Sequence, residues 1–260
     1  MSTLKKVKTV AQVFALVFFS MVISNILRYN LIPFLHRNGA DIPDFFSKKD
    51  KIPTSLQELA RRNPEAADFV AAYPDEKGKV HNIDISAEAE RAKDGKVPLF
   101  IQWDKRWGYE RYSADYAANS ACGPVVMSMA AVFYFEDSCY DPVYMMKWAT
   151  EHGYSTAGSG SLHSLICDGG EELGMNIQEL GPAAAPYYLS CGNPVICLMG
   201  PGDFTSTGHF IILTGFEGDV DSQEGTVTLN DPNSILRSET EYNFSDICGQ
   251  IKRAWRVMKY

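Results

Sequence analysis

Beyond its first ten positions, the sequence lacks any block of basic residues. Its formal net charge at pH 7 is −8, whereas proteins that bind nucleic acid usually present a basic patch or stripe to the phosphates. The composition therefore argues against a nucleic-acid partner. Apolar residues make up 45% of the 260 positions, which is enough for the core of one large domain or two small ones.

Closely spaced cysteine pairs are also missing. The six cysteines stand at positions 122, 139, 167, 191, 197 and 248, and none belongs to a Cys-x-x-Cys pair of the kind that binds structural zinc. His163 and Cys167 lie four residues apart on an expected helix, but no further ligand is near them, so we expect no metal and no other cofactor. We expect most thiols to be free and buried. If the domain is outside the cell, disulfide bonds between some of them are the alternative.

Charged residues are absent from positions 10–27, VAQVFALVFFSMVISNIL, which follow a basic segment at 1–9. A helix of this length spans about 27 Å, enough to cross the core of a bilayer. It is either an uncleaved signal anchor or a cleaved signal peptide, and we favour the anchor because no clean Ala-x-Ala site follows it. The lysines before it favour an N-terminus inside the cytoplasm and residues 28–260 outside it. We expect a membrane-anchored extracytoplasmic domain, or a secreted one if the helix is cleaved.

A helical extension and linker are expected over 28–95. The segments SLQELARR at 55–62 and NPEAADFVAAY at 63–73 are typical of two short helices. The stretch 73–96 is polar, charged and low in large apolar residues, which predicts a linker or a strap over the surface. A denser apolar pattern follows, so the main domain is predicted over 96–260.

Cys122 lies in the stretch NSACGPVVMSMA at 119–130. Pro124 favours a helix start, because its fixed φ suits the first turn and its missing N–H is not needed there. The residues that follow are apolar almost all round, which is typical of a helix buried at the centre of a domain. Cys122 is therefore expected at the N-terminus of a buried helix, where unpaired N–H groups and the helix dipole stabilise a thiolate. From its position alone, Cys122 can be either a nucleophile or a cysteine of the core.

His209 is the histidine whose surroundings best suit a base for such a thiol. It stands in GPGDFTSTGHFIILTGF at 200–216, where a glycine-rich loop runs into an apolar stretch typical of a buried strand. A histidine at the mouth of a central strand can face a cleft. A hydrogen-bonded histidine of the core is the other interpretation, and the residue alone does not decide between them.

Asp231 ends the next expected strand and is the candidate partner of His209. That strand, EGTVTLNDPN at 224–233, shows alternation, and Pro232 cannot continue it. An antiparallel hairpin of the two strands matches apolar residues in this register: His209 with Asp231, Ile211 with Leu229, and Leu213 with Val227. His209 and Asp231 then share a face about 5 Å apart at Cβ, where a carboxylate can fix the imidazole tautomer. An Asx turn before Pro232 is the alternative role for Asp231.

The region 97–260 resembles the family-39-like cysteine peptidases of bacteria, relatives of the leader-cleaving peptidase domains of bacteriocin exporters. The resemblance rests on five segments: PLFIQWDKRWGYERY at 98–112, SACGPVVMSMA at 120–130, GSGSLHSL at 158–165, MGPGDFTSTGHFIILTG at 199–215 and NDPNS at 230–234. It implies an α+β papain-like fold in which the cysteine helix packs on an antiparallel sheet, preceded here by one transmembrane or signal helix. Ala121 and Val125 stand where the family motif usually has glycine and threonine, and neither change removes a reacting group.

The same resemblance implies a role for each of four residues. Cys122 would be the nucleophile, His209 the general base and acid, and Asp231 the orienter of the imidazole. Gln102 would supply an oxyanion-hole side chain beside the backbone N–H of Cys122. It stands twenty residues before the cysteine, whereas papain-type enzymes usually have the glutamine only a few residues before, so a plain strand or turn role for Gln102 stays open.

These residues predict a thiol-dependent peptidase or amide hydrolase that acts through a thioester on a peptide or protein, on the outer side of a membrane. Two alternatives stay open. One is a binding or scaffold protein that keeps the fold without the chemistry. The other is an acyl transferase, resembling a transpeptidase, in which an amine replaces water as the acceptor.

Overall fold

The computed structural model describes residues 49–158 and 160–259. The chain divides into two compact units at Pro74 and Asp75. The expected basic segment at 1–9 and signal helix at 10–27 lie outside the described residues. Within the described part of the chain, no helix has both the length and the apolar character needed to cross a membrane.

The described part of the first unit is helical. It contains η2 (Lys49–Lys51), α4 (Thr54–Arg62), η3 (Pro64–Ala66) and most of α5 (Ala67–Glu76). Asn63 separates the two main helices, and its side-chain oxygen accepts the backbone N–H of Glu65 at 3.1 Å. Because this bond satisfies one of the free N–H groups at a helix start, the chain can end one helix and begin the next within two residues.

An antiparallel sheet of six strands forms the centre of the second unit, in the order β5-β10-β6-β7-β8-β9. Its strands are β5 (Asn176–Leu180), β6 (Val195–Met199), β7 (His209–Asp219), β8 (Glu224–Asn230), β9 (Tyr242–Asn243) and β10 (Ile251–Met258). Two small hairpins accompany it: β1 (Arg111–Tyr112) with β2 (Asp115–Tyr116), and β3 (Ser155–Thr156) with β4 (Gly160–Ser161).

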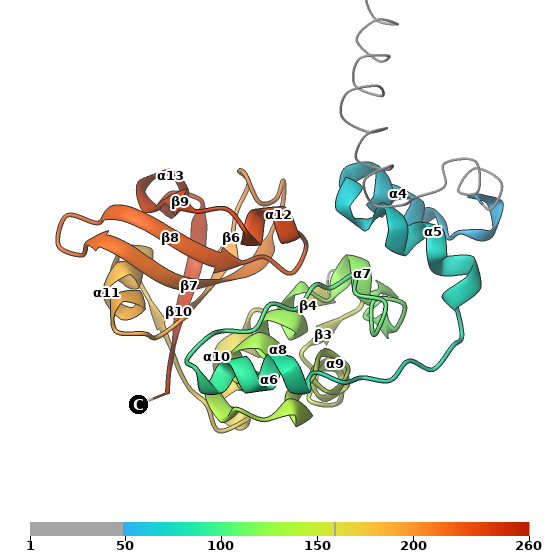
Figure 1. The fold of residues 1–260 in the computed structure, drawn as a ribbon, viewed down its shortest axis with the longest axis horizontal. Coiled ribbons are helices and arrows are strands. Elements are labelled where there is room, and N and C mark those ends of the chain that lie inside the picture. The colour runs from blue at the N-terminus through green and yellow to red at the C-terminus, as the bar shows by residue number, and fades with distance from the viewer. Residues whose placement is uncertain (1–48, 159, 260) are drawn as a thin grey trace, which may run out of the picture. The chain divides into compact units, whose positions relative to one another are not determined.

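Each face of this sheet is covered by its own hydrophobic cluster. Successive side chains of a strand point to opposite faces, so in β6 Ile196 and Leu198 join one cluster while Val195 and Cys197 join the other. On the first face, α8 (Cys122–Phe135) and α10 (Ser164–Glu172) contact the strands, and α6 (Ser86–Lys93) and α9 (Pro142–Glu151) pack against α8 (Figure 1). The other face packs against α11 (Ala185–Ser190) and α13 (Phe244–Cys248). The α+β class predicted from the sequence is confirmed.

The central helix α8 begins at Cys122, as predicted. Its residues from Gly123 to Phe133 are all buried, and α8 contacts α6, α9, α10 and β7. Complete burial of one large apolar side chain, such as Met127, contributes about 1.5–3 kcal/mol to the free energy of folding. The position of Cys122 is therefore fixed by packing along the whole helix. The short helix α7 (Ala117–Ser120) leads into it.

Part of the segment predicted as a linker or strap belongs to the core. Within 73–96, Ile85, Ala89 and Ala92 are buried in the cluster that surrounds α8. Their burial through α6 was hidden in the sequence, because a stripe of two alanines three residues apart adds little to the hydrophobicity of a charged segment. The compact second unit, which starts at Asp75, therefore includes α6.

Candidate active site

Cys122 lies half-buried at the first position of α8, with its sulfur next to donors from two elements. Burial raises the pKa of the Cys122 thiol, but the hydrogen bond and the charge of His209 act against it. The backbone N–H groups of Phe210 in β7 and Gly123 in α8 also donate to the sulfur. Together these donors lower the pKa of Cys122 below its ordinary value, so the site favours the thiolate.

The start of α8 is closed in on one side by β4. A Cβ atom at Gly123 would come within 2.7 Å of Ser161 Oγ, so glycine lets the two segments approach this closely without a shift of Ser161. The hydroxyl groups of Ser161 and Tyr112 lie 2.6 Å apart. Burial and, to a lesser degree, the nearby Cys122 raise the pKa of Tyr112, which keeps this phenol neutral beside the thiolate.

His209 is the first residue of β7 and bonds to both neighbours in the site. Its Nε2 lies 2.6 Å from Asp231 Oδ1, and its ring also bonds to the thiol of Cys122. Burial alone lowers the pKa of His209, but the charge and hydrogen bond of Asp231, followed by those of Cys122, raise it to about 10. The pKa of Cys122 is lowered and the pKa of His209 is raised. Opposite shifts of this kind are expected when the two residues form a thiolate–imidazolium pair.

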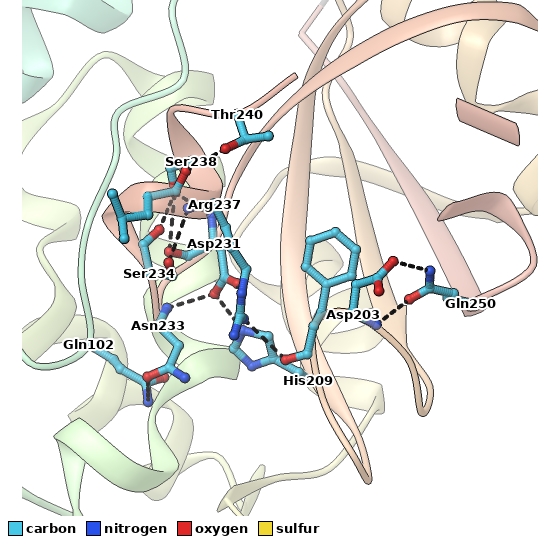
Figure 2. Close-up of polar contacts among 12 residues, drawn as sticks. Gln102, Asp203, His209, Asp231, Asn233, Ser234, Arg237, Ser238, Thr240 and Gln250 are labelled. Carbon is cyan, nitrogen blue, oxygen red and sulfur yellow. Dashed lines mark hydrogen bonds and ion pairs between the residues drawn. The ribbon is translucent and has the colours of Figure 1, made fainter. Parts of the chain in front are cut away.

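Asp231 is completely buried, and hydrogen bonds occupy both of its carboxylate oxygens (Figure 2). Oδ1 accepts from His209 Nε2 at 2.6 Å and from the backbone N–H of Asn233 at 2.7 Å. Oδ2 accepts from Arg237 Nη1 at 2.7 Å. Burial raises the pKa of Asp231, but His209, Asn233 and Arg237 outweigh it and lower the pKa, so the carboxyl group stays ionised. The Asx turn and the contact with His209, which the sequence offered as alternatives, are both present.

The strand register predicted for these two residues is wrong. β7 and β8 form the expected antiparallel hairpin, but Leu213 pairs with Leu229 instead of Val227, and a bulge follows before Gly215. His209 is therefore not directly opposite Asp231, which lies just beyond the end of β8. The shift is two residues at this end of the hairpin. Because a shift of two keeps every side chain on its own face, the imidazole and the carboxylate still meet, along a diagonal.

Gln102 connects the segment before Cys122 to the loop after Asp231. It lies in a turn rather than a strand. Its side-chain Nε2 donates to the backbone oxygen of Ala118 in α7 at 2.7 Å and lies 3.4 Å from Asn233 Oδ1. Its backbone N–H donates to Pro232 O at 2.7 Å. The buried side chain thus faces both walls of the site, and its Oε1 has no hydrogen-bond partner among the described residues.

Two residues that contact Asp231 were missed by the sequence reasoning. Asn233 had a usable signal, because it stands two positions after an aspartate in NDPNS, where an Asx turn bonds its N–H. Arg237 had none. It stands on α12 (Ile235–Ser238), a helix of four residues, and its reach toward Asp231 depends on how the chain folds back after β8.

The remaining thiols lie in ordinary surroundings. All six cysteines are free; Cys139 and Cys191 are exposed, and Cys197 is buried. His163 lies near Phe210, with 6.0 Å between the ring centroids. Across residues 49–158 and 160–259, no group of three or more His, Cys, Asp or Glu side chains is placed to hold a metal ion.

Comparison with known proteins identifies one family for the second unit. No curated protein matches the chain. The model of one protein family, described as "Peptidase_C39 like family", matches residues 95–260, which is more than half of the chain. The matched region includes Gln102, Cys122, His209 and Asp231. The chain therefore belongs to the Peptidase_C39 like family, which gives it in general the character of a cysteine peptidase.

Proposed function

We propose that this chain is a thiol-dependent peptidase or amide hydrolase, with Cys122 as nucleophile, His209 as general base and acid, and Asp231 as the orienter of the imidazole. The observation that carries the proposal is the 2.6 Å bond between His209 Nε2 and the buried Asp231, with Cys122 close enough to His209 that each shifts the pKa of the other. A buried carboxylate at one end and a thiol with a lowered pKa at the other are what activation of a cysteine nucleophile requires.

The reaction begins with the attack of the Cys122 thiolate on the carbonyl carbon of an amide. The carbonyl oxygen becomes an oxyanion, which accepts hydrogen bonds from the backbone N–H of Cys122 at the helix start and from the side chain of Gln102. One such donor contributes about 3–4 kcal/mol to stabilisation of the transition state in other enzymes. The short bond from Gln102 to Ala118 O uses one Nε2 hydrogen and holds the amide beside the residues that precede Cys122, which leaves the second hydrogen, now in a longer 3.4 Å contact with Asn233 Oδ1, for the oxyanion.

Collapse of the oxyanion breaks the C–N bond and leaves a thioester on Cys122. His209 gives its proton to the departing amine and is then neutral. It next takes a proton from a water molecule that attacks the thioester, which releases the acid and regenerates the thiolate–imidazolium pair. Throughout, Asp231 holds His209 Nε2, so that the other ring nitrogen is the one available to the sulfur and the leaving group.

We also propose that the substrate is a peptide or protein met on the outer side of a membrane, with residues 10–27 as the anchor. The uncharged run of these residues and the lysines before it support this placement. A membrane-impermeant thiol probe applied to intact cells tests it. Labelling of Cys122 without permeabilisation is the expected result, and labelling only after permeabilisation would contradict it.

The chemistry itself is tested with Cys122→Ala and the matched variant Cys139→Ala, which removes an exposed thiol outside the site. We expect Cys122→Ala to abolish hydrolysis of a peptide library while the thermal unfolding temperature changes little, because alanine leaves the helix start intact. Cys139→Ala should keep full turnover. Undiminished hydrolysis by Cys122→Ala would refute the proposed mechanism, and inactive wild-type protein with an unreactive Cys122 would favour the binding or scaffold alternative.

A further inference from the structure

We propose that Arg237 is a positioning residue of this site: it ties the Asp231 carboxylate to the loop that precedes His209 and so fixes the geometry of the Cys122–His209 pair. The inference rests on the proposed function, because it concerns how the reacting pair is held. Arg237 is placed to act through Asp231, and its guanidinium has bonds to two segments that are distant in the sequence.

The guanidinium of Arg237 bridges these two segments with a single nitrogen. Nη1 lies 2.7 Å from Asp231 Oδ2 and 3.2 Å from the backbone oxygen of Phe204. Phe204 is buried in the loop 200–208, which runs directly into His209. Arg237 therefore joins Asp231, which orients the imidazole, to the loop 200–208, which leads into His209.

The buried carboxylate needs this partner. Asp231 has no exposed surface, whereas about a third of the Arg237 side chain is exposed. His209 and Asn233 occupy Oδ1, so loss of Arg237 would leave Oδ2 buried without the donor that now reaches it. An unsatisfied buried carboxylate oxygen carries a desolvation penalty, and the group would rotate or admit water to relieve it. Either response changes the direction of the bond to His209.

Hydrogen bonds from two serines hold the backbone around Arg237 in place. Ser234 caps α12 by accepting the N–H of Arg237 at 3.1 Å. Ser238 Oγ accepts the N–H of Asp231 at 2.9 Å and donates to Ser234 O at 2.7 Å. The short helix and the orienting aspartate thus form one hydrogen-bonded turn, shown in Figure 2, from which the arginine reaches toward Phe204.

The loop 200–208 is anchored on its other side by Gln250. The N–H of Asp203 donates to Gln250 Oε1 at 2.8 Å, and Gln250 Nε2 donates to Asp203 Oδ2 at 2.7 Å. Gln250 thus holds the loop to the turn before β10, and Arg237 holds it to Asp231. Of these two residues, Arg237 contacts a member of the Cys122–His209–Asp231 group, whereas Gln250 contacts Asp203.

Two tyrosines interact electrostatically with residues of the site. Tyr242 lies within electrostatic reach of Arg237, Asp231 and Asp203, and burial raises the pKa of Tyr242, so it stays neutral. Tyr112, whose pKa is also raised, faces Cys122. A change in the pH dependence of Cys122 on removal of Arg237 is therefore assigned to Asp231 and His209.

The test compares Arg237→Met and Arg237→Lys with a charge-matched control, Arg253→Met. Arg253 pairs with Glu179 on the exposed side of β10 and makes no contact with the line of reacting residues. The measurement is the rate of alkylation of Cys122 by iodoacetamide between pH 4 and pH 10, followed on the peptide that contains Cys122, together with the thermal unfolding temperature. It needs no substrate.

We expect Arg237→Met to slow alkylation of Cys122 about threefold to tenfold near pH 6 and to move the midpoint of its pH profile upward. Loss of the cation makes the surroundings of the sulfur more negative, and loss of the bond loosens His209; both effects disfavour the thiolate. Arg237→Lys should fall between Arg237→Met and the wild type, because lysine keeps the charge but cannot reproduce the planar fork. Arg253→Met should keep the wild-type profile.

A wild-type pH profile in Arg237→Met would overturn the inference, even with a lower unfolding temperature, because Arg237 would then be structural only. If Arg237→Met does not fold, Arg237→Lys decides: a shifted profile supports the inference and an unshifted one overturns it. Failure of the proposed function looks different, since Cys122 of the wild-type protein would then react with the profile of an ordinary thiol.

Discussion

Two thiols on opposite faces of the same sheet, Cys122 and Cys197, show what activates a cysteine in this protein. Cys197 lies in β6 and pairs with Ile211 of β7, while Cys122 accepts a hydrogen bond from the next residue back, Phe210. Burial, assisted slightly by Cys248, raises the pKa of Cys197. The pKa of Cys122 is lowered although its thiol is desolvated as well. Burial alone suppresses a thiolate, and the donors aimed at the sulfur decide the outcome.

The largest effect is expected when the cation that distinguishes the surroundings of Cys122 from those of Cys197 is removed. His209→Gln takes away the cation beside Cys122 and leaves a side chain of comparable size. We expect peptide hydrolysis to fall by about 10³-fold or more, because the base and acid are lost together. The pH profile of Cys122 alkylation should move above that of a free thiol. Cys197 should remain unreactive in both proteins, which provides an internal control, and a profile unchanged at Cys122 would contradict the role of His209.

A smaller effect is expected from the proposed oxyanion donor. Gln102→Ala should lower kcat about 10²–10³-fold while alkylation of Cys122 by iodoacetamide keeps its wild-type pH profile, because no oxyanion forms in that reaction. Gln102→Glu is the matched variant: it keeps the shape but replaces the donor with an acceptor, so kcat should fall at least as far. A drop in alkylation that parallels the drop in kcat would mean that Gln102 acts only by holding the fold of the site.

The pH dependence of hydrolysis tests whether Cys122, unlike Cys197, exists as a thiolate paired with His209. The lowered pKa of Cys122 keeps its thiolate down to pH values at which an ordinary thiol is protonated, and the raised pKa of His209 keeps the imidazolium up to about 10. Between these limits the reactive pair exists, so hydrolysis should lose activity on the acid side as Cys122 gains a proton. On the alkaline side it should fall near pH 10, as His209 loses one. A profile of kcat/KM with an alkaline limb near pH 6–7 would contradict the ion pair.

The smallest effect on activity is expected at the second thiol. Cys197→Ser replaces a sulfur whose hydrogen-bond acceptor, Val195 O, is 3.8 Å away with a hydroxyl group buried among apolar side chains. We expect it to lower the free energy of unfolding by about 1–3 kcal/mol, because the hydroxyl lacks a good partner, and to leave kcat unchanged. Denaturant unfolding and peptide hydrolysis check the two parts separately. A large loss of kcat without loss of stability would show that the two faces are coupled.

Local signals in the sequence were sufficient for several features of the molecule. Pro124 and the apolar residues after it predicted a buried helix that starts at Cys122, because a helix start and a helix face are properties of neighbouring residues. The strand that begins at His209 and the strand that ends just before Asp231 were also predictable, from an apolar run and an alternating segment. The residue types of the site could thus be named before their geometry was known.

The tertiary structure alone decided how these pieces meet. The apolar pattern of β7 and β8 is nearly the same in registers two residues apart, so the bulge after Leu213 could not be read from it. The burial of Ala89 and Ala92 depends on α8, which comes much later in the chain. The contacts of Gln102 with Ala118 and of Arg237 with Asp231 depend on loops whose paths are set by the packed core. The sequence by itself determined which groups could react, because reactivity belongs to residue types and local helix geometry; the fold determined which donors surround them, because those donors come from distant segments.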